Sequence, residues 1–192
     1  GTINEVLDGI ENPEFLTFAC IPSGSGNDFV RGLSLPRNPM EALEAVLHPQ
    51  KYISVNIGCL ASGSRRRAFG VSSGIGFDAS VCNAAYRSAL KDFLNTFHAG
   101  KLVYMISALK ILFAQKRFSL TLTMDEKTTL SFSEVYFAAA MNLPCEGGGF
   151  RFCPEAEPGD NLLDLCILNK VSRIYALFLL PLALPGKHVN KK

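Results

Sequence analysis

The chain has 192 residues, of which 48% are hydrophobic, and its 19 Lys and Arg against 17 Asp and Glu give a net charge of +2. This composition excludes a disordered tail and a collagen-like fibre. The near balance of charge excludes a strongly basic nucleic-acid arm, so we expect no nucleic acid among the partners. The length suits one large domain or two small ones, since domains commonly run to roughly 100 to 200 residues.

The first third of the chain alternates between helical and strand-like patterns. Residues 3–10 carry apolar side chains at helical spacing behind a capping pair, Thr2 and Glu5. Residues 15–21 form an apolar run between two prolines, which predicts a buried strand. Asn38 and Pro39 predict the cap and first turn of a further helix with one apolar face. This order predicts part of an α/β layer with a parallel sheet.

The rest of the chain is richer in strand patterns. We expect strands at residues 52–57, 69–77, 118–124, 130–141 and 162–168, with helices at 78–90, 102–114 and 171–184. Glycines inside 69–77 predict a strand interrupted by a close approach of another backbone or by a bulge. Residues 61–67 form a small basic loop, and residues 125–127 a turn.

Six cysteines are scattered without a CxxC pair, and most lie in apolar runs. That arrangement is typical of buried, reduced thiols in a cytosolic protein. The longest apolar stretch, residues 174–185, contains Pro181 and is shorter than the roughly 20 residues that a membrane-spanning helix needs. We therefore expect a cytoplasmic protein without a membrane-spanning helix.

A loop rich in glycine and serine, residues 22–28, follows the first predicted strand and precedes a short helical stretch. Glycines allow backbone N–H groups to approach an anion closely, and a helix start adds unpaired N–H groups. The loop could therefore cradle a nucleotide phosphate, with the Ser25 hydroxyl as an additional donor. An ordinary surface turn explains the same residues.

Two further segments could carry chemistry. The start of the chain, Gly1 and Thr2, stands at the tip of a capped helix, which suits a phosphate. Asp160 stands where a loop enters a strand, a usual place for a catalytic carboxylate, and Asp164 lies within that strand. An ordinary helix cap and a turn-forming aspartate are the competing explanations.

Together these segments resemble the diacylglycerol kinase catalytic-domain family, the bacterial lipid kinases related to sphingosine kinases. The match rests on five blocks that occur in the family's order: residues 1–6 (GTINEV), 22–31 (PSGSGNDFVR), 74–79 (GIGFDA), 147–165 and 186–188 (GKH). The resemblance implies an incomplete α/β nucleotide-binding domain of the NAD kinase and phosphofructokinase type over residues 1–52. A β-sandwich-like lipid-substrate domain would follow over residues 53–192.

The family pattern also extends beyond both ends of this sequence. The resemblance therefore implies an internal fragment that is inactive by itself. The activity that it implies for the family is transfer of the γ-phosphoryl group of ATP, with Mg²⁺, to the hydroxyl of a membrane lipid such as diacylglycerol.

The resemblance also assigns site residues. The nucleotide would contact residues of the first two blocks: Gly1, Thr2, Asn4, Gly24, Ser25, Gly26, Asn27 and Asp28. Asp160 would be the general base, and Asp78 would bind the lipid head group. The sequence departs from the family's Asp-Asp-Gly by carrying Gly159 and Asn161 on either side of Asp160. Asn tolerates left-handed backbone angles better than most residues, so the turn can survive.

The implied partners are the lipid substrate and, transiently, the inner membrane surface. Arg65, Arg66 and Arg67 could contact anionic head groups at about 1 kcal/mol per charge, although a solvated run of charge is the simpler explanation of the same residues. The sequence leaves a homodimer open. Two other functions stay open as well: a non-catalytic lipid- or nucleotide-binding protein of the same fold, and a soluble nucleotide kinase.

Overall fold

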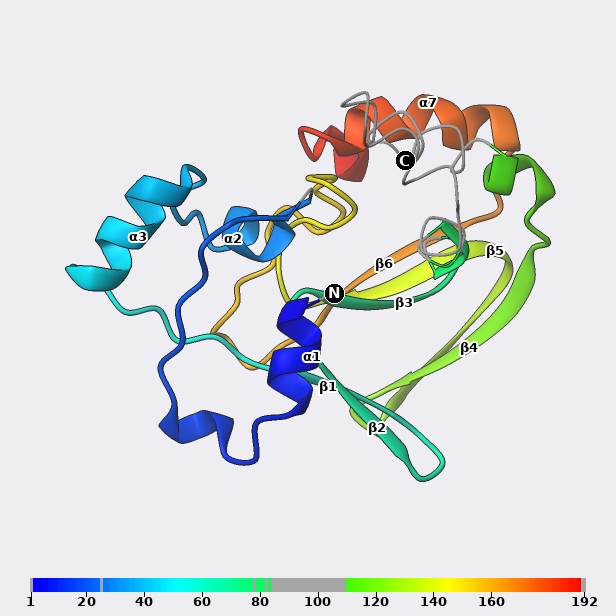
Figure 1. Cartoon of the computed structure of the whole chain (residues 1–192). Helices are drawn as coiled ribbons and strands as arrows, with labels where there is room; N and C mark the ends of the chain where they lie inside the picture. The colour runs from blue at the N-terminus through cyan, green and yellow to red at the C-terminus, as the bar shows by residue number, and fades with distance from the viewer. Residues whose placement is uncertain (1, 25, 78, 82, 84–109, 191–192) are drawn as a thin grey trace. The chain divides into compact units, whose positions relative to one another are not determined.

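The computed structural model describes residues 2–24, 26–77, 79–81, 83 and 110–190 (Figure 1). Within them the chain forms two compact units, each assembled from separate stretches of sequence. The first unit contains residues 1–73, 140–165 and 181–192, and the second contains residues 74–139 and 166–180. The predicted helices 78–90 and 102–114 lie largely outside the described residues, although residues 110–114 are helical.

The helices of the first unit begin where local signals predicted them. Helix α1 (Thr2–Asp8) buries Leu7. Helix α2 (Asp28–Gly32) follows the glycine-serine loop. Helix α3 (Pro39–Leu47) is capped by Asn38, whose Oδ1 accepts hydrogen bonds from the backbone N–H groups of the first turn at 2.8 and 3.4 Å. This confirms the predicted cap.

Two predicted strands are wrong. Residues 15–21 contain no strand: a short 3-10 helix, η1 (Pro13–Phe15), ends at Phe15, and the Phe15 side chain is 82% exposed. Residues 52–57 are also irregular. A strand exists only where a second strand completes its hydrogen bonds. In the part of the chain that the structure describes, no strand pairs with either segment, and the expected parallel sheet is not seen there.

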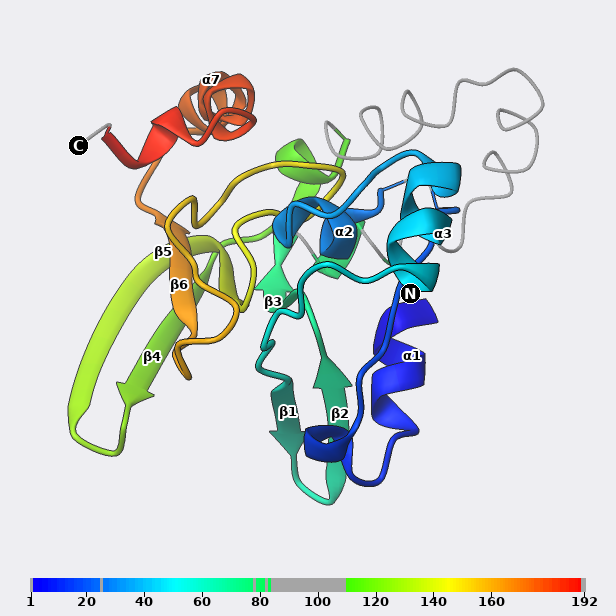
Figure 2. The same cartoon turned by 90° about the vertical axis from the view of Figure 1, so that its left-hand side faces the viewer.

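A two-stranded hairpin replaces the basic loop expected at residues 61–67. Strands β1 (Gly58–Ser62) and β2 (Arg65–Phe69) pair antiparallel, with Ala61 opposite Arg66. Figure 2 shows the hairpin beside α1. Asp8 joins them, because its carboxylate accepts from the backbone N–H of Ala68 at 2.9 Å and from Arg67 at 2.7 Å. These two donors lower the pKa of Asp8.

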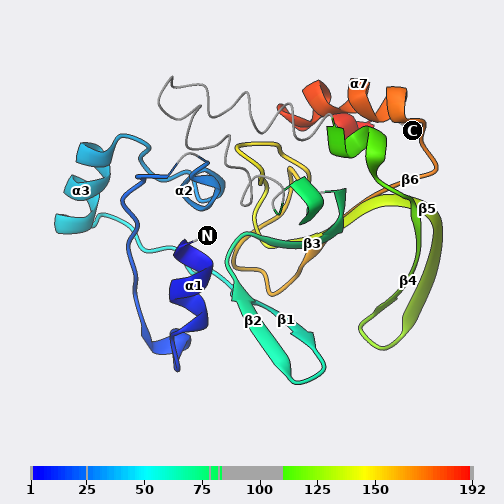
Figure 3. The same ribbon diagram turned by 45° about the vertical axis from the view of Figure 1, so that its right-hand side comes forward.

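A four-stranded sheet supplies most of the second unit. Its order is β3 (Ser72–Gly76), β5 (Thr128–Met141) and β4 (Phe118–Met124), and β6 (Asp164–Asn169) also pairs with β5. Strands β4 and β5 form a long, curved antiparallel hairpin around the predicted turn at residues 125–127 (Figure 3). The predicted close approach is confirmed at Gly76, where an added Cβ would collide with the carbonyl oxygen of Tyr136.

Strand β5 carries the core of the second unit. Val135, Tyr136 and Phe137 are at most 5% exposed. The Arg117 guanidinium lies 5.0 Å from the centroid of the Tyr136 ring and donates to its hydroxyl at 3.1 Å, which satisfies a buried polar group.

The chain ends with helix α7 (Arg173–Ala183), which contains Pro181, and the 3-10 helix η2 (Lys187–Asn190). The predicted helix at 171–184 is thus confirmed. Among the described residues, every helix is too short or too polar to cross a bilayer.

Candidate functional site

The glycine-serine loop is organised by Asn27. This residue adopts a left-handed conformation, with φ of 53°, immediately before α2. Its side-chain Oδ1 accepts from the backbone N–H of Gly24 at 3.0 Å, and a Cβ added to Gly24 would lie 3.0 Å from the same oxygen. The tight turn therefore depends on the small residue at position 24 and the amide at position 27.

Asp28 joins this loop to a turn 120 residues further along the chain. Its Oδ2 accepts a hydrogen bond from the backbone N–H of Gly148 at 2.8 Å. Gly26 lies in the same place, because a Cβ added to it would be 3.9 Å from the Cα of Gly148. The second and fourth family blocks thus meet within the first unit.

Arg31 adds a second link between the same two segments. Its Nη2 donates to the carbonyl oxygen of Gly26 at 3.1 Å, and its Nε lies 3.6 Å from Oδ1 of Asp28. On its other side the guanidinium packs against Gly149, where an added Cβ would lie 2.7 Å from Nη1. Gly149 has φ of 108°, a conformation that favours glycine. The sequence analysis assigned Arg31 no role, although its spacing of three residues from Asp28 on a helix was a usable signal.

The remaining nucleotide-side predictions are not brought together with this loop. Thr2 is exposed at the first position of α1. Asn4 uses its Oδ1 to accept from the backbone N–H of Gly70 at 3.1 Å. Among the described residues, no hydrogen bond joins Thr2 or Asn4 to residues 24–28. Three other predicted site residues lie outside the described residues: Gly1, Ser25 and Asp78.

Asp160 stands on an exposed turn that leads into β6. Its Oδ1 accepts from the backbone N–H of Leu162 at 2.9 Å, the geometry of an Asx turn. In the described part of the chain, nothing donates a hydrogen bond to its Oδ2. Asn161 has φ of 63°, so the left-handed turn survives the replacement of glycine by asparagine.

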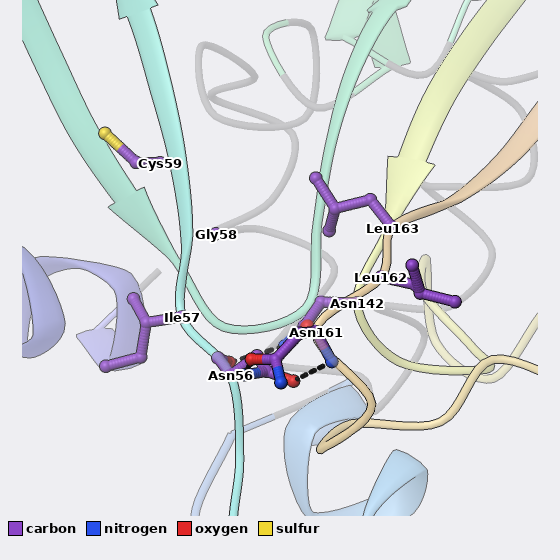
Figure 4. A pocket seen from close by; sticks show the side chains of 8 residues that line it. All are labelled: Asn56, Ile57, Gly58, Cys59, Asn142, Asn161, Leu162 and Leu163. Carbon is purple, nitrogen blue, oxygen red and sulfur yellow. Dashed lines mark hydrogen bonds between the residues drawn. The ribbon is translucent and has the colours of Figure 1, made fainter. Parts of the chain in front are cut away.

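The turn is held by Asn56, a residue that the sequence analysis did not single out. The side chains of Asn56 and Asn161 lie together in Figure 4. Asn56 donates from Nδ2 to Oδ1 of Asn161 at 2.7 Å, and its Oδ1 accepts from the backbone N–H of Asn161 at 2.9 Å. Its own backbone N–H donates to the carbonyl oxygen of Pro158 at 2.6 Å.

A pocket of 260 Å³ opens beside this amide pair. Three asparagine amides, three apolar side chains, a glycine and a thiol line it (Figure 4): Asn56, Asn142, Asn161, Ile57, Leu162, Leu163, Gly58 and Cys59. Asn142 is 1% exposed and donates from Nδ2 to the carbonyl oxygens of Asn56 at 2.8 Å and Gly70 at 3.0 Å. No sequence signal pointed to Asn56 or Asn142, because both act on residues distant in sequence.

The carboxylates around the turn share a negative environment. Burial raises the pKa of Asp164, and the charges of Asp160 and Glu155 raise it further. Within the described residues, no three His, Cys, Asp or Glu side chains are grouped so that they could hold a metal ion. The thiol of Cys145 is an unsuitable nucleophile, because burial and the nearby Asp28 charge raise its pKa.

The chain is similar to named lipid kinases over nearly its whole length. It is 30% identical over 99% of its residues to the "Putative lipid kinase YtlR" of Bacillus subtilis. It is 28% identical over 97% of its residues to a diacylglycerol kinase of Mycobacterium tuberculosis. The chain spans 62% and 57% of the length of these two relatives.

A solved structure shares the fold. The crystal structure of "a putative diacylglycerol kinase" from Bacillus anthracis superposes with a TM-score of 0.68 at 22% identity, covering 95% of this chain and 58% of that one.

Two domain families together match most of the chain. Residues 1–58 match the diacylglycerol kinase catalytic domain, and residues 71–192 match the YegS C-terminal NAD kinase beta sandwich-like domain. The expected fold class, an α/β part followed by a β-sandwich-like part, is thereby confirmed. The chain therefore belongs to the family of the YegS C-terminal NAD kinase beta sandwich-like domain, and its first 58 residues match the diacylglycerol kinase catalytic domain.

Proposed function

We propose that this chain takes part in transferring the γ-phosphoryl group of ATP to the hydroxyl of a membrane lipid such as diacylglycerol. One observation carries the proposal beyond family membership: Asp28 and Arg31 bind the glycine-serine loop to the turn at residues 147–149. The second and fourth of the blocks that the chain shares with the family are thus in contact. Such a loop, bounded by glycines, suits close approach of phosphate oxygens to backbone N–H groups.

The described residues fit a nucleotide better than a separately bound metal. Gly24 is exposed, so a nucleotide could approach the loop there, although the Gly24 N–H itself donates to Oδ1 of Asn27. The described residues include no group of three His, Cys, Asp or Glu side chains that could hold a metal ion, and in this proposal Mg²⁺ would bind together with ATP. There it would neutralise the charge that develops during phosphoryl transfer.

Asp160 is the proposed proton acceptor for the lipid hydroxyl. A hydroxyl is a weak nucleophile until its proton leaves, and a positioned carboxylate typically accelerates such a step by about 10²- to 10⁴-fold. The exposed carboxylate keeps Oδ2 without a hydrogen-bond donor among the described residues, while Oδ1 holds the turn. Oδ2 can therefore accept the proton of the lipid hydroxyl, while Oδ1 stabilises the turn.

The activity is tested on the complete natural protein with radiolabelled ATP and Mg²⁺, with NAD and with a panel of lipid alcohols in mixed micelles as acceptors. Label in one lipid supports the proposal and identifies the substrate. Label in NAD alone would favour a soluble nucleotide kinase. ATP binding without any labelled product would overturn the proposal in favour of a non-catalytic lipid- or nucleotide-binding protein.

The role of Asp160 is tested by Asp160→Asn, which keeps an oxygen acceptor for the Leu162 N–H but cannot take up a proton. We expect kcat to fall by about 10²-fold or more, with the Kd for ATP unchanged. Unchanged kcat would contradict the assignment. Recovery of activity at high Mg²⁺ would also contradict it, because that result would make Asp160 a magnesium ligand instead.

A further inference from the structure

The Asp160 turn has an asparagine where the family pattern has glycine. Glycine would supply only the left-handed backbone. Asn161 adopts that conformation, with φ of 63°, and also places an amide side chain against Asn56. The side chain thus forms a contact that a glycine could not make.

The segment that contains Asn56 contacts three residues of the turn: Pro158, Gly159 and Asn161. The backbone N–H of Asn56 donates to the carbonyl oxygen of Pro158 at 2.6 Å. Gly159 packs on the carbonyl oxygen of Ser54, where an added Cβ would lie 2.9 Å from it. The Asn56 side chain then makes both of its hydrogen bonds to Asn161. Asp160 is the residue between the second and third of these contacts.

Asn56 is itself fixed from the interior of the first unit. Its carbonyl oxygen accepts from Nδ2 of the buried Asn142, and the backbone N–H of Asn142 donates to the carbonyl oxygen of Val71 at 2.8 Å. A chain of hydrogen bonds therefore runs from buried backbone to the exposed turn. Nδ2 of the buried Asn142 donates to the carbonyl oxygens of both Asn56 and Gly70, whereas its Oδ1 has no hydrogen-bond partner among the described residues.

We propose that Asn56 and Asn161 are a positioning pair that holds the Asp160 carboxylate in its working orientation. The proposal rests on the proposed function, since it concerns the role of Asp160 there. Neither asparagine touches substrate in this scheme; both act through the turn. The pair also compensates for the glycine that the turn lacks, because two hydrogen bonds hold the left-handed residue in place.

The test is a double-mutant cycle in the complete natural protein, with Asn56→Ala, Asn161→Gly and both together. Asn161→Gly suits the left-handed backbone and keeps the N–H that Asn56 accepts, so it removes only one hydrogen bond. Asn56→Ala removes both. Thr123→Ala is the matched control, because it breaks an exposed side-chain pair with Thr129 in the second unit.

We expect kcat to fall by about tenfold or more in Asn56→Ala and by less in Asn161→Gly, because small misplacements of a reacting group are costly. The KM for ATP should stay unchanged, and so should both constants in Thr123→Ala. The kcat of the double variant should equal that of Asn56→Ala alone, because the Asn161 side chain has already lost its partner in that variant. Additive losses of kcat would overturn the proposal. So would parallel losses of kcat and of the urea midpoint, which would indicate a structural role only.

A readout without catalysis separates this proposal from the proposed function. Amide hydrogen exchange at Asn161 and Leu162 should accelerate in Asn56→Ala, because both N–H groups are bonded within the held turn. Faster exchange in a protein that phosphorylates no lipid would support the positioning role of Asn56 and Asn161 and contradict the proposed kinase activity. Unchanged exchange in an active kinase would contradict the pair.

Discussion

Single side chains bind the segment 145–165 to the rest of the first unit. Asp28 holds its beginning at Gly148, and Asn56 holds its end at Asn161. Between these two contacts, Nε2 of His188, a residue of the fifth family block, lies 3.2 Å from the carbonyl oxygen of Phe152. Each contact joins residues that are at least 36 apart in sequence. The conformation of the segment thus depends on a few individual residues.

His188 predicts a pH dependence of stability. Burial lowers its pKa below the ordinary 6.5, although the Phe152 carbonyl partly opposes the shift. The unfolded chain then binds the proton more readily than the folded one. The contribution to stability is complete above about pH 6.5 and is lost as the pH falls towards the lower pKa of the folded state. Urea unfolding between pH 7.5 and 5.5 should show this decline, and His188→Gln should reduce it. The control, His48→Gln, removes an exposed imidazole and should keep the wild-type slope. Equal slopes in all three proteins would contradict the prediction.

Elements with local signals were predicted correctly, and so were strands β3 and β6, but two other segments with strand-like sequences are irregular. The cap of α3 was readable because Asn38 bonds N–H groups two and three residues away. The β4–β5 hairpin was readable because its turn is short. Residues 15–21 and 52–57 have strand-like sequences, but pairing is decided by other segments. In the same way, the loop at residues 24–28 was found by its glycines, whereas Asn56 was missed because its function depends on a turn 105 residues away.

The turn at residues 147–149 offers a matched pair of glycines. Both Gly148 and Gly149 have positive φ, so alanine is strained at either position. Only at Gly149 would the new Cβ meet a neighbour, the Arg31 guanidinium; the space at Gly148 is open. Urea unfolding should therefore show a loss of about 1 to 3 kcal/mol for Gly148→Ala, from strain alone, and a larger loss for Gly149→Ala. Gly149→Ala should also weaken ATP binding by displacing Arg31 from the loop. Equal effects of the two variants on stability and on ATP binding would show that the Arg31 contact contributes nothing.

At the scale of the molecule, each unit is assembled from pieces that lie far apart in the sequence. The chain leaves the first unit after residue 73, returns at 140, leaves again after 165 and returns at 181. The site of the first unit draws on its first two pieces, with Asp28 and Asn56 from one and Gly148 and Asn161 from the other. Periodicity and motifs identify such blocks separately. Only the family resemblance implied that they work together, and only the structure shows which side chains join them.

The hairpin of β1 and β2 is the proposed contact with the membrane surface. Arg65 and Arg66 are exposed, whereas Arg67 is occupied by Asp8. Each free arginine near an anionic surface contributes about 1 kcal/mol, or roughly fivefold in affinity. The complete protein should bind phosphatidylglycerol vesicles, and Arg65→Ala with Arg66→Ala should weaken that binding by about 30-fold.

A matched control and the ionic strength decide whether the hairpin itself is responsible. Lys127→Ala removes an exposed charge from the β4–β5 turn, where Asp125 and Glu126 offset it, and should change vesicle binding little. Raising the salt to about 0.5 M should weaken wild-type binding, because charges at the surface are screened, and should affect the double arginine variant much less. If Lys127→Ala weakens binding as strongly as Arg65→Ala, the attraction is a general effect of positive charge and the hairpin has no special role. If the double variant binds phosphatidylglycerol vesicles as the wild type does, another surface makes the contact.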